Sequence, residues 1–343
     1  MNNSLAIEAN PGNIDAGLHV IEQATGYTYQ AALRAAVILN LADILKTGPK
    51  TAQQIALETN TQAPIIKQIL RLLATRNIFK TIKGEGFALT PSAEFLLSDH
   101  PYSVRQAILM MTDKTFWMTL YELSDMAAGK PVFTNRFKES FYDYWEKNDD
   151  NPNGFHEGMS SLSKIENNYI VKSYDFPENI TIADIAGGFG GLLLEVLKTN
   201  PTTNGILFDR KHVLAKNILH LLGDNTRWRV QPGSFFEECP EADIYLLKYI
   251  SHNWSDEQTV QIFKTIRQAM SPSSKLLLIE NIITEDDQPY FGHELGLICT
   301  NLSADAGERT AIEFSQLLTL ASLKINRIIN TNAHHYIIEV LPL

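Results

Sequence analysis

From residue 179 onward, short apolar runs alternate with segments of helical periodicity, and this alternation constrains the fold more than any other feature. The strand-like runs are, in order, ITIADIAG, NGILFD, RWRVQ, DIYLLK and KLLLIENII. The helix-like segments among and after them are GLLLEVLKTN, HVLAKNILHLLG, DEQTVQIFKTIRQAM and AIEFSQLLTLA. Such alternation is typical of an α/β fold with a parallel, doubly wound sheet.

The chain ends in two further strand-like runs, KINRII and YIIEVL, which only NTNAHH separates. A connection this short cannot carry the crossover helix that a parallel pair needs, so the two runs should form an antiparallel hairpin. The sequence therefore predicts a Rossmann-like sheet with an antiparallel C-terminal hairpin, which differs from a plain dinucleotide-binding fold.

The preceding part, residues 14–120, is mostly helical in its periodicity. Ala31–Leu45 is apolar on most faces, which predicts one buried helix. The order of a winged helix follows: a helix (TAQQIALET), a turn (NTQA), a second helix (PIIKQILRLLATRN) and a hairpin around GEG. The second helix carries the basic residues Lys67, Arg71 and Arg76, but the chain has a net charge of −10. Because phosphate binding needs a basic surface, a packing or dimerisation role is favoured, and DNA binding is the alternative.

The composition also bears on the cellular setting. Cys239 and Cys299 are the only cysteines and lie far apart, which suits a reducing compartment without a disulfide framework. The first residues, MNNSLAIEANPGN, are not those of a signal peptide, and no run approaches the ~20 apolar residues of a membrane span. We therefore expect a cytoplasmic protein that has neither a membrane nor a nucleic acid as its partner.

A glycine-rich loop, DIAGGFGG, follows the first strand-like run and opens a helix at residues 184–191. Glycines let a ligand approach the backbone, and a helix N-terminus offers free N–H groups. The dinucleotide pattern G-x-G-x-x-G fits poorly, because its third position would be Leu193, and no P-loop motif occurs. Asp209 ends the second strand, where it could accept both hydroxyls of a ribose; a plain surface carboxylate is the alternative.

The run LLKYISHNWSDEQ, Leu246–Gln258, places Lys248 and His252 just beyond a buried strand. Ligands bind at that end of the strands in open α/β sheets. The alternative for His252 alone is a structural histidine, and Trp254 is interpreted as a packing residue. Ser255-Asp256 has the composition of a helix N-terminus.

Taken together, these segments resemble the class I S-adenosylmethionine-dependent O-methyltransferases, in particular the group that contains the plant caffeate and flavonoid enzymes, hydroxyindole O-methyltransferase and bacterial polyketide O-methyltransferases. DIAGGFGG, FDRKHV, GSFFEECPEADIYLLKYISHNWSDE and AGERTAIEF carry the resemblance, which extends from about Gly17 to Leu341. It implies three parts: a winged-helix dimerisation domain at 1–100, a helical linker and substrate region at 101–172, and a cofactor-binding methyltransferase domain at 173–343.

The resemblance also implies a role for individual residues. The general base would be His252, flanked by Glu280 and Glu308. Contacts to S-adenosylmethionine, and to its product S-adenosylhomocysteine, would come from Ser163, Asp184, Gly188, Gly190, Asp209, Ser234, Phe235 and Lys248. The acceptor pocket would be lined by Met110, Met111, Trp145, Phe155, Met159, Asn253, Cys299 and Ser303. No metal is expected, since carboxylates with metal-ligand spacing are not seen in the sequence. The N-terminal domain would form a homodimer.

The chain departs from this family's usual pattern at several places. Ala186 stands where a glycine is frequent, and an alanine fits there if its φ is negative. Ser234 replaces an aspartate, and Asn253 replaces the aspartate that usually follows the histidine. Methionine and aromatic residues in the acceptor region favour a flat, largely apolar small molecule.

The chemistry agrees with methyl transfer. A phenol of pKa about 10 is little ionised at neutral pH, so a histidine that takes the proton as the oxygen attacks would accelerate the reaction. The favoured hypothesis is an O-methyltransferase that acts on an aromatic or polyketide-like hydroxyl. One alternative is a cofactor-binding relative repurposed for pericyclic, decarboxylation or hydroxylation chemistry; the other is a DNA-binding regulator.

Overall fold

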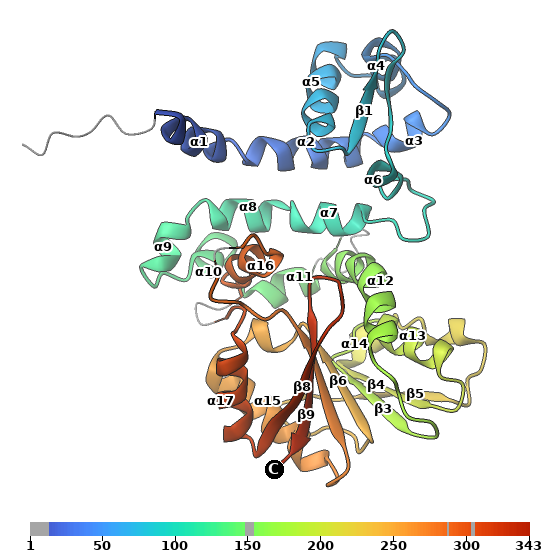
Figure 1. Cartoon of the computed structure of the whole chain (residues 1–343), viewed down its shortest axis with the longest axis vertical. Coiled ribbons are helices and arrows are strands. Elements are labelled where there is room, and N and C mark those ends of the chain that lie inside the picture. The colour runs from blue at the N-terminus through green and yellow to red at the C-terminus, as the bar shows by residue number, and fades with distance from the viewer. Residues whose placement is uncertain (1–13, 148–153, 287, 303–305) are drawn as a thin grey trace, which may run out of the picture. The chain divides into compact units, whose positions relative to one another are not determined.

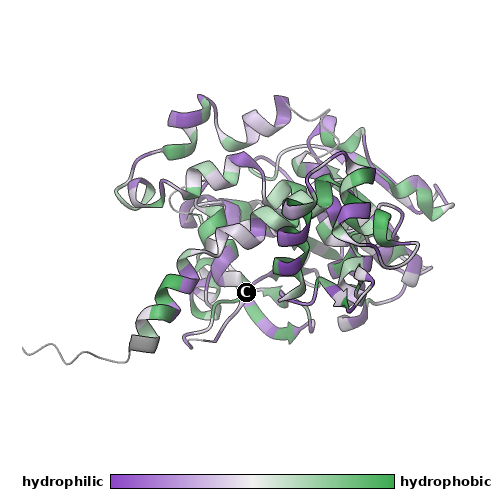
Figure 2. Cartoon of the chain, turned by 90° about the horizontal axis from the view of Figure 1, so that it is seen from above, coloured by the Kyte–Doolittle hydropathy of each residue, from purple (hydrophilic) through white to green (hydrophobic). Residues whose placement is uncertain are grey.

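The structure is a computed structural model that describes residues 14–147, 154–286, 288–302 and 306–343 (Figure 1). The chain folds into two compact units, residues 1–112 and residues 113–343. The helices of both units carry hydrophilic and hydrophobic residues in alternation (Figure 2), as expected of helices with one face in a core.

The first unit is helical apart from one hairpin. Its elements are α1 (Ile14–Ala24), α2 (Tyr27–Ile38), α3 (Leu41–Leu45), α4 (Ala52–Thr59), α5 (Ala63–Ala74), β1 (Phe79–Ile82), β2 (Gly86–Leu89), α6 (Pro91–Glu94) and α7 (Arg105–Met111). A capping box between Thr51 and Gln54 begins α4. The predicted helix–turn–helix–hairpin order is confirmed, with β1 antiparallel to β2.

One helix prediction in this unit is wrong. Ala31–Leu45 is not a single helix, because α2 ends at Ile38 and α3 begins at Leu41. Asn40 between them has a φ of +54°, in the left-handed region. Asparagine adopts that conformation more readily than most residues, so the break has a local cause that the apolar pattern conceals.

The second unit begins with α8 (Lys114–Leu120), α9 (Leu123–Ala127), α10 (Val132–Phe137), α11 (Phe141–Lys147) and α12 (Phe155–Ser173). A sheet follows, in the order β5-β4-β3-β6-β7-β9-β8. Its strands are β3 (Thr181–Ile185), β4 (Asn204–Asp209), β5 (Trp228–Pro232), β6 (Ile244–Lys248), β7 (Lys275–Glu280), β8 (Leu323–Asn330) and β9 (Tyr336–Pro342). β3 to β7 run parallel, whereas β9 lies antiparallel to both β7 and β8. The predicted sheet and its C-terminal hairpin are confirmed.

Helices cover both faces of this sheet. They are α13 (Gly191–Thr199), α14 (Lys211–Leu214), α15 (Asp256–Ala269), α16 (Phe291–Cys299) and α17 (Ala311–Leu320), with 3₁₀ turns η1 (Leu219–Leu222) and η2 (Ser251–Asn253). Alternate residues of β3 enter different cores: Ala183 packs with Phe263 of α15, and Ile182 packs with Leu193 of α13. This period of two places the sheet between two apolar layers.

Two further expectations fail in the second unit. HVLAKNILHLLG forms only α14 and η1, because Asn217 interrupts the helix: its side chain donates to the carbonyl of Leu214 and accepts from the N–H of Leu219. The helix α16 was not expected at all, since two glycines weaken its helical signal. Its last residue is Cys299.

Candidate active site

Two carboxylates lie near the ends of the adjacent strands β3 and β4. Asp184 is 2% exposed, and its Oδ2 has no hydrogen-bond partner among the described residues. Asp209, at the end of the adjacent β4, accepts from the N–H of Gly188 at 2.9 Å and from that of Arg210 at 2.7 Å. Burial, together with the charge of Asp209, raises the pKa of Asp184 to about 7. A buried oxygen without a partner and with a raised pKa favours a cationic ligand group beside it.

The glycine loop leaves room for such a ligand. Gly188 has a φ of +59°, and a Cβ added there would meet no atom within 4 Å. A Cβ on Gly187 would come within 2.5 Å of the Asp184 carboxylate, so only glycine fits there. Ala186 has a φ of +54°, so the condition stated for an alanine to fit there, a negative φ, is not met. The loop keeps its left-handed conformation at that position despite the Cβ, at a cost of roughly 1–2 kcal/mol.

Ser234 and Phe235 follow β5 beside this loop. The N–H of Gly233 donates to the carbonyl of Asp209 at 3.1 Å, which ties the segment to the end of β4. The Ser234 hydroxyl accepts from the N–H of Phe236 at 3.3 Å. Phe235 and Phe236 contact Trp254, with ring centroids at 6.0 and 4.9 Å, so the prediction that Trp254 packs is confirmed.

A buried ion pair lies at the end of β6. Lys248 Nζ is 2.7 Å from Glu166 Oε2, and the two side chains are 9% and 3% exposed. The same ammonium donates to the hydroxyl of Ser163 at 3.1 Å and to Asn167 Oδ1 at 3.2 Å, so the two predicted cofactor contacts Lys248 and Ser163 lie together. Burial raises the pKa of Glu166, but the charges of Lys248 and His335 together with hydrogen bonds from Lys248 and Tyr249 more than offset it, so the pKa lies below its usual value.

His252 lies in η2, immediately after β6, and its side chain is 6% exposed. Its Nδ1 is 2.8 Å from Glu308 Oε1 and 3.6 Å from Glu280 Oε2. The ring stacks on Tyr249 with a centroid distance of 5.3 Å and an interplanar angle of 4°. The structure therefore brings together the three residues assigned to catalysis.

Hydrogen bonds hold both glutamates in place. Glu280 Oε1 accepts from the N–H of Ser251 at 2.8 Å, from its hydroxyl at 2.6 Å and from the N–H of Ile250 at 3.1 Å. Glu308 Oε1 accepts from the side-chain amide of Asn281 at 2.9 Å. Each carboxylate is thus fixed by donors other than the histidine.

The groups around His252 stabilise the charged imidazolium form of its ring. Burial by itself lowers the pKa of His252, but Cys299, Glu308 and Glu280 act against it and raise the pKa well above its usual value. Burial also raises the pKa of Glu280, and the positive charge of His252 opposes this. The thiol of Cys299, at the end of α16, is 2% exposed beside the ring. The same residues could hold a metal ion, because one ligand atom each of His252, Cys299 and Glu308 lies within 4.8 Å of the others.

The predicted acceptor residues are distributed unevenly. Trp145 on α11 and Phe155 on α12 are in contact, with ring centroids at 6.2 Å, and Met159 lies one helical turn after Phe155. The side-chain amide of Asn253 donates to the carbonyl of Tyr249 at 2.9 Å. Met110 and Met111 lie on α7 of the first unit, and Ser303 lies outside the described residues. The pocket assignment stays a prediction.

Sequence reasoning missed the residues that support this site. Glu166 anchors Lys248, Asn281 anchors Glu308, and Tyr249 joins both groups, since its hydroxyl donates to Glu166 at 2.8 Å while its ring stacks on His252. No motif points to Glu166 or Asn281. The position of Tyr249 between Lys248 and the histidine segment was the one available signal.

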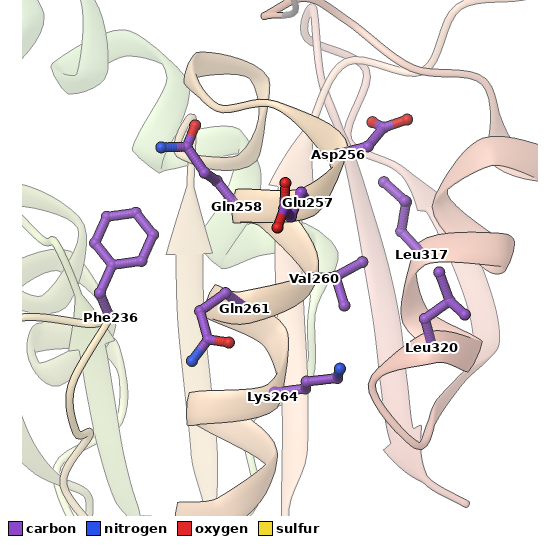
Figure 3. A pocket seen from close by; sticks show the side chains of 9 residues that line it. All are labelled: Phe236, Asp256, Glu257, Gln258, Val260, Gln261, Lys264, Leu317 and Leu320. Carbon is purple, nitrogen blue, oxygen red and sulfur yellow. The ribbon is translucent and has the colours of Figure 1, made fainter.

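A hollow of about 620 Å³ lies elsewhere, between α15 and α17. Val260 points from α15 toward Leu317 and Leu320 of α17 (Figure 3). None of the residues that line it belongs to the predicted site: Phe236, Asp256, Glu257, Gln258, Val260, Gln261, Lys264, Leu317 and Leu320. The buried, oriented acid–base groups lie at His252, so this hollow is not part of the candidate site.

Comparison with known proteins agrees with this geometry. Residues 21–99 match the O-methyltransferase dimerisation domain, and residues 117–324 match the O-methyltransferase domain. A phenazine O-methyltransferase of Lysobacter antibioticus is 31% identical over 327 residues, which cover 94% of this chain and 96% of the relative. A mitomycin biosynthesis 6-O-methyltransferase of Streptomyces lavendulae is 31% identical over 304 residues, covering 86% of each chain.

Among solved structures, a methyltransferase of calicheamicin biosynthesis in its S-adenosylhomocysteine-bound form superposes with a TM-score of 0.89 and 35% identity. The superposition covers 96% of this chain and 99% of that one. Both domains match in the expected order, and the relatives align over nearly the full chain. The chain therefore belongs to the family of S-adenosylmethionine-dependent O-methyltransferases.

Proposed function

We propose that this enzyme transfers a methyl group from S-adenosylmethionine to a hydroxyl of a flat, aromatic small molecule, with His252 as the general base. The observation that carries the proposal is the buried His252–Glu308 contact of 2.8 Å at the end of β6. Glu308 accepts from Nδ1, which leaves Nε2 to take a proton from the acceptor.

His252 has a basicity suited to this task. The flanking groups raise its pKa well above its usual value, which brings it closer to the pKa of about 10 of a phenol. Proton transfer to a positioned base is most effective when the two pKa values approach each other. When the phenolic oxygen attacks, Nε2 receives the proton, and the Glu308 carboxylate stabilises the imidazolium that forms.

The cofactor residues fit S-adenosylmethionine. This cofactor supplies an electrophilic methyl group on a sulfonium sulfur. Asp184 Oδ2, buried and without a partner among the described residues, would receive its ammonium group. The open space over Gly188 would admit the methionine part, and Asp209 would receive the ribose hydroxyls. Lys248 with Ser163, and Ser234 with Phe235, would complete the site.

The acceptor class rests on the aromatic lining and on the relatives. Trp145 and Phe155 supply ring faces, and Met159 supplies a polarisable side chain. A phenazine, which a relative methylates, is itself a flat fused aromatic system. No metal is required in this proposal, since a base and an aligned electrophile suffice.

We also propose a cytoplasmic homodimer. The match of residues 21–99 to the dimerisation domain supports the assembly, and two free cysteines suit a reducing compartment. Among the described residues, no helix combines the length and apolar character that a bilayer span requires.

The experiment that tests the function compares the wild type with His252→Ala on a panel of phenols. The wild type should form S-adenosylhomocysteine and methylated phenol in equal amounts, and the variant should lose ~10²–10⁴-fold in kcat while it still binds the cofactor. Conversion of an acceptor without consumption of S-adenosylmethionine would favour the alternative of a repurposed, non-methylating enzyme.

A further inference from the structure

We propose that His252, Cys299 and Glu308 form a binding site for Zn²⁺, and that its occupation stops methyl transfer. One ligand atom from each residue lies within 4.8 Å of the other two. An imidazole nitrogen, a thiol sulfur and a carboxylate oxygen are the three ligand types that Zn²⁺ takes in proteins. Three protein ligands leave the fourth tetrahedral position for water or the acceptor oxygen.

The three ligands come from separate segments, and hydrogen bonds tie the segments of His252 and Glu308 together. The N–H of Gly307 donates to the carbonyl of His252 at 2.9 Å, which holds the Glu308 segment beside η2. On the other side of Glu308, the Arg309 guanidinium donates to the carbonyl of Ser251 at 2.8 Å. Cys299 ends α16. With Zn–S near 2.3 Å and Zn–N near 2.0 Å, tetrahedral ligand atoms lie roughly 3.5 Å apart. One ligand atom of each of the three residues already lies within 4.8 Å of the others.

Charge and burial also favour the ion. The side chains of His252 and Glu308 are 6% and 1% exposed, Cys299 is 2% exposed, and Glu308 Oε2 has no hydrogen-bond partner among the described residues. Zn²⁺ would be bound by one thiolate and one carboxylate, whose charges balance its own, and the Glu280 carboxylate lies 3.6 Å from His252 Nδ1. A buried charge is stable when it is paired or coordinates a metal.

The ligand set selects against the common magnesium ion. Mg²⁺ requires near-octahedral oxygen coordination and retains its waters, whereas this site offers sulfur and nitrogen. On binding, Zn²⁺ displaces to solvent the thiol proton of Cys299 and the proton on the coordinating nitrogen of His252 where it carries one, and it then occupies the lone pair of that nitrogen. The imidazole can then no longer receive the proton of the acceptor. This inhibition rests on the proposed role of His252, but the binding of the ion does not.

Binding is tested on the full-length, chelator-treated protein, with Cys239→Ser as the matched control because the chain has only two cysteines. Calorimetric titration of the wild type and of Cys239→Ser should show binding of one equivalent of Zn²⁺. Titration of the same two proteins with Co²⁺, followed by absorption spectroscopy, should show a thiolate-to-cobalt charge-transfer band. Cys299→Ser should lose the band and bind Zn²⁺ at least ~10-fold more weakly. Glu308→Gln, which leaves the thiol intact, should retain the band and show the same weakening. A band that persists in Cys299→Ser, or equal Zn²⁺ affinity in all four proteins, overturns the site.

Inhibition is tested separately. Zn²⁺ should abolish methyl transfer by the wild type and by Cys239→Ser, a chelator should restore it, and Mg²⁺ at the same concentration should have no effect. Full activity with one equivalent of Zn²⁺ bound would overturn the inhibitory role. If no methyl transfer occurs in the absence of metal either, the proposed function fails, and the calorimetric result still decides whether the site exists.

Discussion

Replacing Glu308 with glutamine tests how the carboxylate assists His252. The substitution keeps the size of the side chain and an oxygen that can accept from Nδ1, 2.8 Å away, but it removes the negative charge. A hydrogen bond to a charged group contributes about 1.5–3 kcal/mol and one between neutral groups about 0.5–1.5 kcal/mol. The midpoints of these ranges differ by about 1.3 kcal/mol, which is roughly tenfold in kcat.

The assay measures kcat and KM for an accepted phenol and, separately, the affinity for S-adenosylmethionine by calorimetry. We expect kcat of Glu308→Gln to fall roughly tenfold while the cofactor affinity stays unchanged, since the interaction strengthens only as the imidazolium forms.

Glu280→Gln is the matched control. Glu280 Oε2 lies 3.6 Å from Nδ1, and its Oε1 already accepts from Ser251 and Ile250, so its replacement should reduce kcat less and the free energy of unfolding more. Unchanged kcat in Glu308→Gln, or an equal loss in both variants, would refute the assignment of Glu308 as the partner of the base.

Three further predictions concern the cofactor side of the site. The pKa of Asp184 is about 7, and the ammonium group of the cofactor binds better to the ionised carboxylate. The affinity for S-adenosylmethionine should therefore rise as the pH increases from about 6 to 7. Calorimetry should show this pH dependence in the wild type, and Asp184→Asn should abolish it. Ala186→Gly should raise the free energy of unfolding, measured by urea titration, by about 1 kcal/mol, because glycine adopts a φ of +54° without the strain that an alanine has there. A decrease would show that the loop is unstrained at this residue. Lys248→Met leaves Glu166 buried without its ion partner and should lower the free energy of unfolding by about 3–5 kcal/mol. The double variant Lys248→Met/Glu166→Gln should recover most of this loss. No recovery would mean that the broken ion pair does not cause the loss.

The sequence predicted the sheet well because its signal is local and repeated. The inner strands β3, β4, β6, β7 and β9 are buried on both faces, so each reads as an apolar run. The short link before Tyr336 determines the antiparallel end. The ends of helices were predicted less well where a single side chain terminates the helix. Asn40 and Asn217 end helices that an apolar pattern alone would continue.

The site was predictable to the extent that its residues follow strand ends. Lys248 ends β6, His252 follows it in η2, and Asp209 ends β4, so topology alone brings them to one edge. Glu166 and Asn281 act through hydrogen bonds to partners distant in sequence, and no spacing rule reveals such contacts. At Ala186 the residue type alone is misleading. An alanine favours a negative φ, but the loop imposes a positive one.

The most direct test of the account is the balance of products in one reaction. Purified enzyme, S-adenosylmethionine and a phenol that it accepts should give S-adenosylhomocysteine and methylated phenol in a one-to-one ratio, and His252→Ala should bind the cofactor normally while its kcat falls by at least ~10²-fold. Product formation with the cofactor left intact, or a His252→Ala variant as active as the wild type, would contradict methyl transfer by a histidine base.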